Sequence, residues 1–181
     1  LRQAMAASYG RPVVPSFHLD KARYMLSFGA EFLETWISNV EFAGDFAAMH
    51  SFGHTPAPAR FVCAGPRLSL TAANADTWWA ARPGTEAMIA AALAEEVGRR
   101  LGRAPGRTGA AAALTLAAAA AASEVPLSEL EQAAAALAAI RPSLVLGTGY
   151  GGDTRTAVAC WEAANRLNDL VGNTGVTVAP H

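Results

Sequence analysis

The sequence is short of charge and of cysteine, and both shortages narrow the classes of protein to which it can belong. Only 16% of its 181 residues are charged and the formal net charge is −1, so no basic surface argues for a nucleic-acid partner. The two cysteines, Cys63 and Cys160, lie outside any CxxC motif. Two thiols alone cannot hold an iron–sulfur cluster or a structural zinc ion.

Long apolar runs and metal-binding patterns are also missing from the sequence. The longest nearly apolar run, residues 109–122, is mostly alanine and is too short to span a bilayer. The histidines at positions 18, 50, 54 and 181 show no metal-ligand spacing. His50 and His54 are four residues apart, but Gly53 and Pro56 argue against a helix there. We therefore predict no metal site and no Ser/His/Asp catalytic triad.

The apolar content, 52% of the residues, is sufficient for one well-packed core. We expect a single α/β domain over residues 1–181, with a lead-in at 1–19 and a linker at 103–109 between two halves. The sequence begins at Leu1 rather than at a methionine and ends abruptly at residues 179–181. We accordingly expect a piece of a longer polypeptide.

Short apolar runs alternate with helical patterns along the chain. The short apolar runs predict strands at residues 24–28, 60–64 and 144–146, with shorter candidates at 13–14, 78–81 and 176–178. Helices are predicted up to residue 9 and at 40–50, 85–101, 110–122, 127–140 and 154–171. Thr85 is placed to cap one helix, and Ser128 with Glu131 has capping-box spacing in another. The alternation predicts a Rossmann-like parallel sheet with helices on both faces.

Ligands of such sheets bind at the carboxyl ends of the strands. After the strand at 144–146, the glycines Gly147, Gly149 and Gly152 match the spacing of a dinucleotide fingerprint. The acidic residue expected about 20 positions later falls at Asn168-Asp169, inside a predicted helix. A site of the NAD type and a simple tight turn therefore remain alternatives for this loop.

Two other strand exits carry polar side chains. Glu31 and Glu34 could bind ribose hydroxyls or a guanine edge, or could cap the turn that follows them. The segment 67–76 supplies hydrogen-bonding groups at Arg67, Ser69, Thr71 and Asn74 and ends in Asp76, followed by a pair of tryptophans. Asp76 could instead satisfy local backbone N–H groups.

Taken together, these segments resemble one family. Residues 26–36 (LSFGAEFLETW), 66–76 (PRLSLTAANAD) and 82–86 (RPGTE), with Leu167-Asn168 and residues 172–175, resemble the molybdopterin oxidoreductases of the dimethyl-sulfoxide-reductase type. The likeness spans about residues 20–178. The sequence of residues 32–36 is most similar to one branch of this family. That branch contains the quinol-linked complexes, including alternative complex III, and the polysulfide or thiosulfate reductases.

The resemblance implies an α/β domain that holds one of two molybdopterin guanine dinucleotides by its strand-end loops. Glu86 matches an acidic position of the family that accepts guanine N–H bonds. By matching position, the cofactor-binding residues would be Gly29, Ala30, Glu31, Arg67, Ser69, Thr71, Asp76, Gly84, Thr85 and Glu86.

The same resemblance implies that the chemistry takes place elsewhere. Molybdenum and the iron–sulfur cluster would be bound by regions outside this chain, with no catalytic residue or metal ligand within it. The partners would be the remaining domains of the same catalytic subunit, an iron–sulfur subunit and a membrane anchor subunit, in a bacterial membrane-associated complex.

One departure leaves an alternative open. The family often has Asp or Glu before the Pro-Arg pair, where it binds ribose, and this chain has Gly65. Members of the alternative-complex-III branch resemble the enzymes and lack the cofactor. The alternative is therefore a cofactor-free structural domain of a quinol-oxidising membrane complex.

Overall fold

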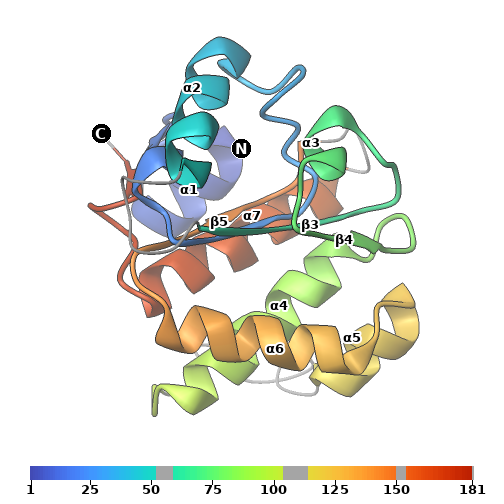
Figure 1. Ribbon diagram of the computed structural model, residues 1–181. Coiled ribbons are helices and arrows are strands. Elements are labelled where there is room, and N and C mark those ends of the chain that lie inside the picture. Colours follow the sequence, from blue (N-terminus) through green and yellow to red (C-terminus); the bar gives the residue numbers. More distant parts are fainter. Residues whose placement is uncertain (52–58, 104–113, 150–153, 181) are drawn as a thin grey trace.

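A four-stranded, fully parallel sheet forms the centre of the computed structural model, which describes residues 1–51, 59–103, 114–149 and 154–180 (Figure 1). Its strands are β2 (Tyr24–Ser27), β3 (Arg60–Gly65), β4 (Thr77–Ala80) and β5 (Ser143–Leu146). They are arranged in the order β4-β3-β2-β5. The sheet confirms the predicted Rossmann-like α/β class.

The order of the strands creates a switch point beside β2. The chain passes from β2 to β3 and then to β4, and returns to place β5 on the other side of β2. Leu26 of β2 thus pairs with Val62 on one side and Val145 on the other. Because the connections from β2 and β5 leave in different directions, the carboxyl ends of these two strands flank the position where open α/β sheets bind ligands.

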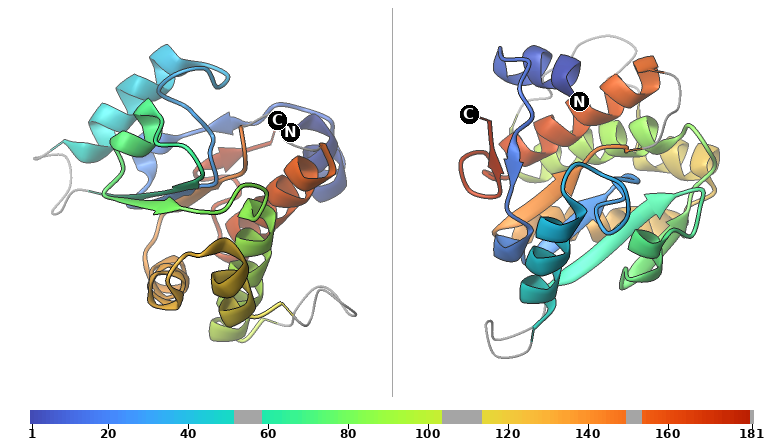
Figure 2. Two further views of the ribbon diagram at one scale, coloured as in Figure 1. Left: turned by 90° about the vertical axis from the view of Figure 1, so that its right-hand side faces the viewer. Right: turned by 90° about the horizontal axis from the view of Figure 1, so that it is seen from above.

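Helices cover both faces of the sheet (Figures 1 and 2). On one face lie α4 (Glu86–Arg100), α5 (Leu116–Ser123) and α6 (Leu127–Ala139), with α7 (Thr154–Leu170) packed against α4 and β5. On the other face lie α1 (Arg2–Tyr9), the turn η1 (Leu19–Lys21), α2 (Asn39–His50) and the short α3 (Leu70–Ala73).

Two hydrophobic cores result, one on each face of the sheet. Leu26 and Val62 face the core under α4 to α7, whereas Met25 and Phe61 face the core under α1 to α3. Side chains alternate between the two faces of a strand, so both sets must be apolar when both faces are covered. This explains why the strands appear in the sequence as continuous apolar runs.

A second, two-stranded sheet lies outside the main one. It pairs β1 (Ser16–Phe17) antiparallel with β6 (Val178–Ala179). The short strand predicted at residues 13–14 was therefore misplaced, because the only described partner for this segment, β6, pairs with Ser16 and Phe17. None of the described helices is both long and apolar enough to cross a membrane.

Two predicted helix caps are not formed. Thr85 occupies the N-cap position of α4, but its hydroxyl donates to the Arg82 carbonyl at 2.6 Å instead of accepting a helix N–H. The prediction of a capping box at Ser128 is wrong, because Pro126 is the N-cap residue and α6 already begins at Leu127. The helix predicted at 110–122 begins at Leu116, where Thr115 is the N-cap residue. Residues 104–109 of the predicted linker and 110–113 of the predicted helix lie outside the described residues.

Side-chain amides close the outer edge of β5. Asn168 of α7 accepts the Val145 N–H at 2.9 Å and donates to the Val145 carbonyl at 2.8 Å. Asn173 donates to Asn168 at 2.8 Å and accepts the Ser143 N–H at 3.2 Å. The two amides therefore take the place of a further strand, satisfying backbone groups that burial would otherwise leave unpaired.

We expect Asn168→Ala to lower the free energy of unfolding by about 2–5 kcal/mol, because it leaves two buried backbone groups without partners. Chemical denaturation measures the change. The matched control is Asp169→Asn at the exposed neighbouring position, which we expect to shift stability by less than about 0.5 kcal/mol. Equal effects of the two substitutions would contradict the edge-closing role.

Both thiols are buried in the folded chain. Burial raises the pKa of Cys63 and of Cys160 to about 12. At pH 8 only about one thiol in ten thousand is then ionised, and the thiolate is the reactive form. We expect no labelling of either cysteine by a disulfide reagent in the native protein and labelling of both in guanidinium. Rapid labelling of the native protein would contradict this packing.

Candidate functional site

Four loops meet at the carboxyl edge of the parallel sheet. They follow β2 at residues 28–31, β3 at 66–69, β4 at 81–85 and β5 at 147–149. The loops contain seven of the ten residues for which the resemblance implies cofactor contacts, Thr71 and Glu86 follow in the first turns of α3 and α4, and Asp76 is the exception. The edge is therefore the candidate site.

Glu31 is the most buried carboxylate on the α2–α3 side of this edge. Its side chain is 7% exposed and forms an ion pair with the Arg67 guanidinium through Oε2. The other oxygen, Oε1, is buried and has no hydrogen-bond partner among the described residues. The Glu31 carbonyl accepts the N–H groups of residues 34, 35 and 36 at 3.0–3.1 Å, which holds this residue in place.

The loop around Glu31 is supported from β2. Ser27 Oγ accepts the Ala30 N–H at 3.0 Å, and Gly29 has a positive φ of 85°. Gly29 and Ala30 thus form the tight exit that aims Glu31 along the edge. Both residues lie where the resemblance places cofactor contacts.

Arg67 joins two acidic residues. In addition to Glu31, it contacts the Glu34 carboxylate at 3.2 Å, and its own side chain remains 60% exposed. Glu34 Oε1 accepts the Leu70 N–H at 2.5 Å. The hydrogen bond from the Leu70 N–H is the largest cause that lowers the pKa of Glu34, and contacts with Glu31 and Arg67 lower it further. Glu34 therefore remains a carboxylate at neutral pH.

The sequence predicts a polar loop at residues 67–76, whereas the structure forms the short helix α3 within it. Ser69 caps this single turn by accepting the Ala72 N–H at 3.1 Å, and Thr71 accepts the Leu33 N–H at 3.1 Å. Both side chains are buried and bonded within the protein. The signal was present, since Ser69 precedes Leu-Thr-Ala-Ala, a cap followed by residues compatible with a helix.

Asp76 lies at the opposite end of the sheet from the other candidates. It precedes β4, and its Oδ2 accepts the N–H of Phe61, near the start of β3, at 2.6 Å. His50 approaches the same oxygen at 3.6 Å. Asp76 therefore satisfies a backbone N–H, as one of its two expected roles required, but that group lies on the neighbouring strand β3 and not in the loop itself.

Glu86 occupies the other face of the sheet at the same edge. It is 6% exposed in the first turn of α4, after Gly84 with a φ of 82°. Its charge contributes to the raised pKa of Cys160 in α7, after the larger effect of burial. Glu86 with Gly84 and Thr85 therefore belongs to the α4–α7 side, whereas Glu31 and Arg67 belong to the α2–α3 side.

The glycines after β5 permit close contacts within the chain. A Cβ at position 147 would overlap the Trp161 indole, whose N–H donates to the Thr148 carbonyl at 2.8 Å. A Cβ at position 149 would lie 2.9 Å from the Gly29 carbonyl oxygen, which accepts the Gly149 N–H at 3.0 Å. The described glycines of the motif thus serve contacts within the chain, and Gly152 lies outside the described residues.

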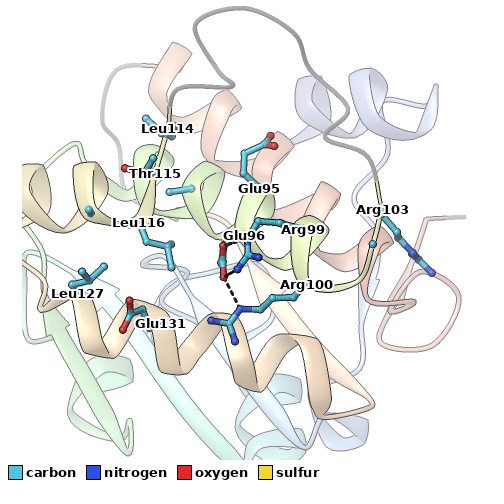
Figure 3. A pocket seen from close by; sticks show the side chains of 13 residues that line it. Glu95, Glu96, Arg99, Arg100, Arg103, Leu114, Thr115, Leu116, Leu127 and Glu131 are labelled. Carbon is cyan, nitrogen blue, oxygen red and sulfur yellow. Dashed lines mark hydrogen bonds and ion pairs between the residues drawn. The ribbon is translucent and has the colours of Figure 1, made fainter.

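A cavity of about 900 Å³ lies away from this edge, between α4, α5 and α6 (Figure 3). Arg99 and Arg100 on its wall both contact Glu96 at 2.7 Å. The Arg99 hydrogen bond is the main cause that lowers the pKa of Glu96 to about 2. These charges are satisfied by one another. The described residues contain no cluster of side chains suited to a metal ion.

Comparisons with known proteins support the family resemblance at a coarse level. The chain is 41% identical over 78 residues to the menaquinone reductase molybdopterin-binding-like subunit of Nitratidesulfovibrio vulgaris, a match that covers 43% of this chain and 11% of that protein. No protein-family model matches. The name of this relative agrees with the resemblance of the sequence to molybdopterin oxidoreductases.

A solved structure shows the same fold. Acetylene hydratase from Pelobacter acetylenicus superposes with a TM-score of 0.72 at 16% identity, over 97% of this chain and 25% of that one. At this identity the likeness concerns the fold alone. The chain spans about a tenth and a quarter, respectively, of the two proteins it matches.

We expect Gly147→Ala to destabilise the fold by about 1–3 kcal/mol, because the added methyl group collides with the Trp161 ring. The matched control is Gly44→Ala in the middle of α2, where a Cβ meets nothing within 4 Å. There we expect a gain of about 0.4–1 kcal/mol. Thermal unfolding of the two variants measures both changes. If Gly147→Ala had the stability of the unaltered chain, the packing role of this glycine would be contradicted.

Proposed function

We propose that this chain is an α/β domain of a molybdopterin oxidoreductase subunit and that its carboxyl edge holds the guanosine end of a molybdopterin guanine dinucleotide. The observation that carries the proposal is the buried, unpartnered Oε1 of Glu31, located next to the switch point of the sheet. A buried carboxylate oxygen without a donor is unfavourable unless a ligand or water supplies one. Ribose hydroxyls and guanine N–H groups are such donors.

The other residues would have distinct roles in this site. Arg67 is the exposed cation suited to a phosphate, and the backbone of Gly29 and Ala30 allows close approach of the ligand. Gly84, Thr85 and Glu86 would contact the ligand from the α4 side, where the carboxylate of Glu86 can accept guanine N–H bonds. Ser69 and Thr71 would act through the position of α3, because their hydroxyls are already bonded.

The residues fit the nucleoside end of the cofactor better than its phosphates. Glu31 and Glu86 supply buried acceptors for donors on the nucleoside. The phosphates would meet Arg67 in contact with two carboxylates. When bound, the cofactor supplies the redox chemistry, and this chain would bind and orient it.

A second candidate function is a cofactor-free structural domain. Two observations favour it, namely the full pairing of Arg67 and the presence of Gly65 where an acidic ribose ligand is frequent in the family. The relative in Nitratidesulfovibrio vulgaris is itself named as molybdopterin-binding-like. The NAD-type alternative has less support, because Asn168 is bonded to β5 and the described glycines serve internal contacts.

The wider setting follows from the same proposal. The relative is named as a subunit of a menaquinone reductase, which supports a multisubunit assembly. We place this chain, as a single domain, within a longer catalytic subunit of the quinol-linked or polysulfide reductase branch. Regions outside this chain would hold molybdenum and the iron–sulfur cluster, and the partners would be the remaining domains of that subunit, an iron–sulfur subunit and a membrane anchor subunit.

Titration with GDP and with NAD tests the proposal. Trp36 stacks on Trp161 beside the loops that follow β2 and β5, with ring centroids 5.8 Å apart, so tryptophan fluorescence should report binding at this edge. We expect binding of GDP and not of NAD. Glu31→Gln should weaken GDP binding about tenfold or more, since it removes a charged acceptor.

The matched control is Glu41→Gln, at an exposed glutamate in the first turn of α2. We expect it to bind GDP as the unaltered chain does. If the folded protein does not respond to GDP, the cofactor site is refuted and the structural alternative is favoured. A response to NAD of equal strength would favour the NAD-type alternative.

A further inference from the structure

Arg67 is the cation nearest to the unpartnered oxygen of Glu31, and it is already engaged twice. Its guanidinium bonds to Glu31 and to Glu34 at the same time. The Arg67 side chain is 60% exposed, whereas the Glu31 side chain is 7% exposed. An anion that reaches this edge therefore meets a guanidinium whose charge two carboxylates already satisfy.

The Glu34 carboxylate and the Glu31 backbone are held in place independently of Arg67. Glu34 accepts the Leu70 N–H at 2.5 Å, and its carbonyl accepts the side-chain amide of Asn39 at 3.0 Å. The Glu31 backbone is fixed by the turn that follows it. Of the three charged groups, the long and exposed side chain of Arg67 is the one that can move without breaking the loop structure.

We infer that Arg67 and Glu34 form an anion-responsive latch beside Glu31. The guanidinium bonds to both carboxylates until the diphosphate of an incoming nucleotide draws it from Glu34, while it keeps its bond to Glu31. The nucleoside then meets the other, free oxygen of the Glu31 carboxylate. This inference rests on the proposed function and adds to it the group that limits affinity, namely Glu34.

The energetics favour such an exchange. A diphosphate carries more charge than one carboxylate and matches the donor fork of arginine in the same bidentate manner. The Arg67–Glu34 pair is partly exposed to solvent, and pairs of this kind contribute little to stability. The nucleotide therefore competes against a weak contact, and removal of the Glu34 charge should make the competition easier.

GDP titrations of the unaltered chain, Glu34→Gln, Arg67→Gln and the double variant test the latch. Glu34→Gln keeps an oxygen for the Leu70 N–H and removes only the charge. We expect it to tighten GDP binding about two- to fivefold, the range expected for loss of an exposed ion pair. In the Arg67→Gln background the same change should give no gain, because the two effects are coupled.

Two further variants make the result specific. Glu41→Gln removes the same charge from an exposed site without contact to Arg67 and should leave affinity unchanged. Glu34→Asp keeps the charge on a shorter side chain and should also tighten binding, because the pair with Arg67 is lost. This variant decides the question if Glu34→Gln does not fold, as judged by thermal unfolding.

The outcomes separate the latch from the proposed function. If the unaltered chain binds GDP and neither Glu34 variant binds it more tightly, the latch is refuted and the nucleotide site stands. A gain that persists with Arg67→Gln shows simple repulsion by Glu34 and also refutes the latch. If no variant binds GDP, the proposed function fails and the latch fails with it.

Discussion

Strand β2 is paired on both sides and buried on both faces, and the arrangement of the molecule depends on this double constraint. Its register with β3 and β5 brings the exits of the central strands to one edge. Glu31 leaves β2 at this edge, where it meets Arg67 from the loop after β3. The Gly149 N–H, after β5, reaches back to the Gly29 carbonyl. A shift of β2 by one residue would exchange its two apolar faces and separate these contacts.

The candidate site is built on an electrostatic balance. One guanidinium faces two carboxylates, and one carboxylate oxygen remains without a donor. In a partly buried setting, such a balance is sensitive to a single added charge. The same cluster can therefore belong to a domain that receives a nucleotide or to one that retains the fold and has no ligand. Under the proposed latch, these two functions differ in how readily Arg67 leaves Glu34.

Much of the fold was predictable because its signals are local. The apolar runs of β2, β3 and β5 and the periodic patterns of α2, α4, α6 and α7 each lie within a few consecutive residues. Misplaced features depended on distant partners. The position of β1 follows from β6, more than 150 residues later. The start of α6 follows from Pro126, not from the capping-box spacing of Ser128.

The sequence alone determined the α/β class, the strand-end loops and the likeness to the molybdopterin oxidoreductases, because hydrophobic periodicity and sequence motifs are contained in short segments. Only the tertiary structure decided which side chains share an edge. It separated Asp76 from Glu31 by the length of the sheet, and it engaged Ser69 and Thr71 in holding α3. It also placed Arg67, 36 residues from Glu31 along the chain, upon that carboxylate. Such pairings depend on strand order and register, which no local stretch of sequence specifies.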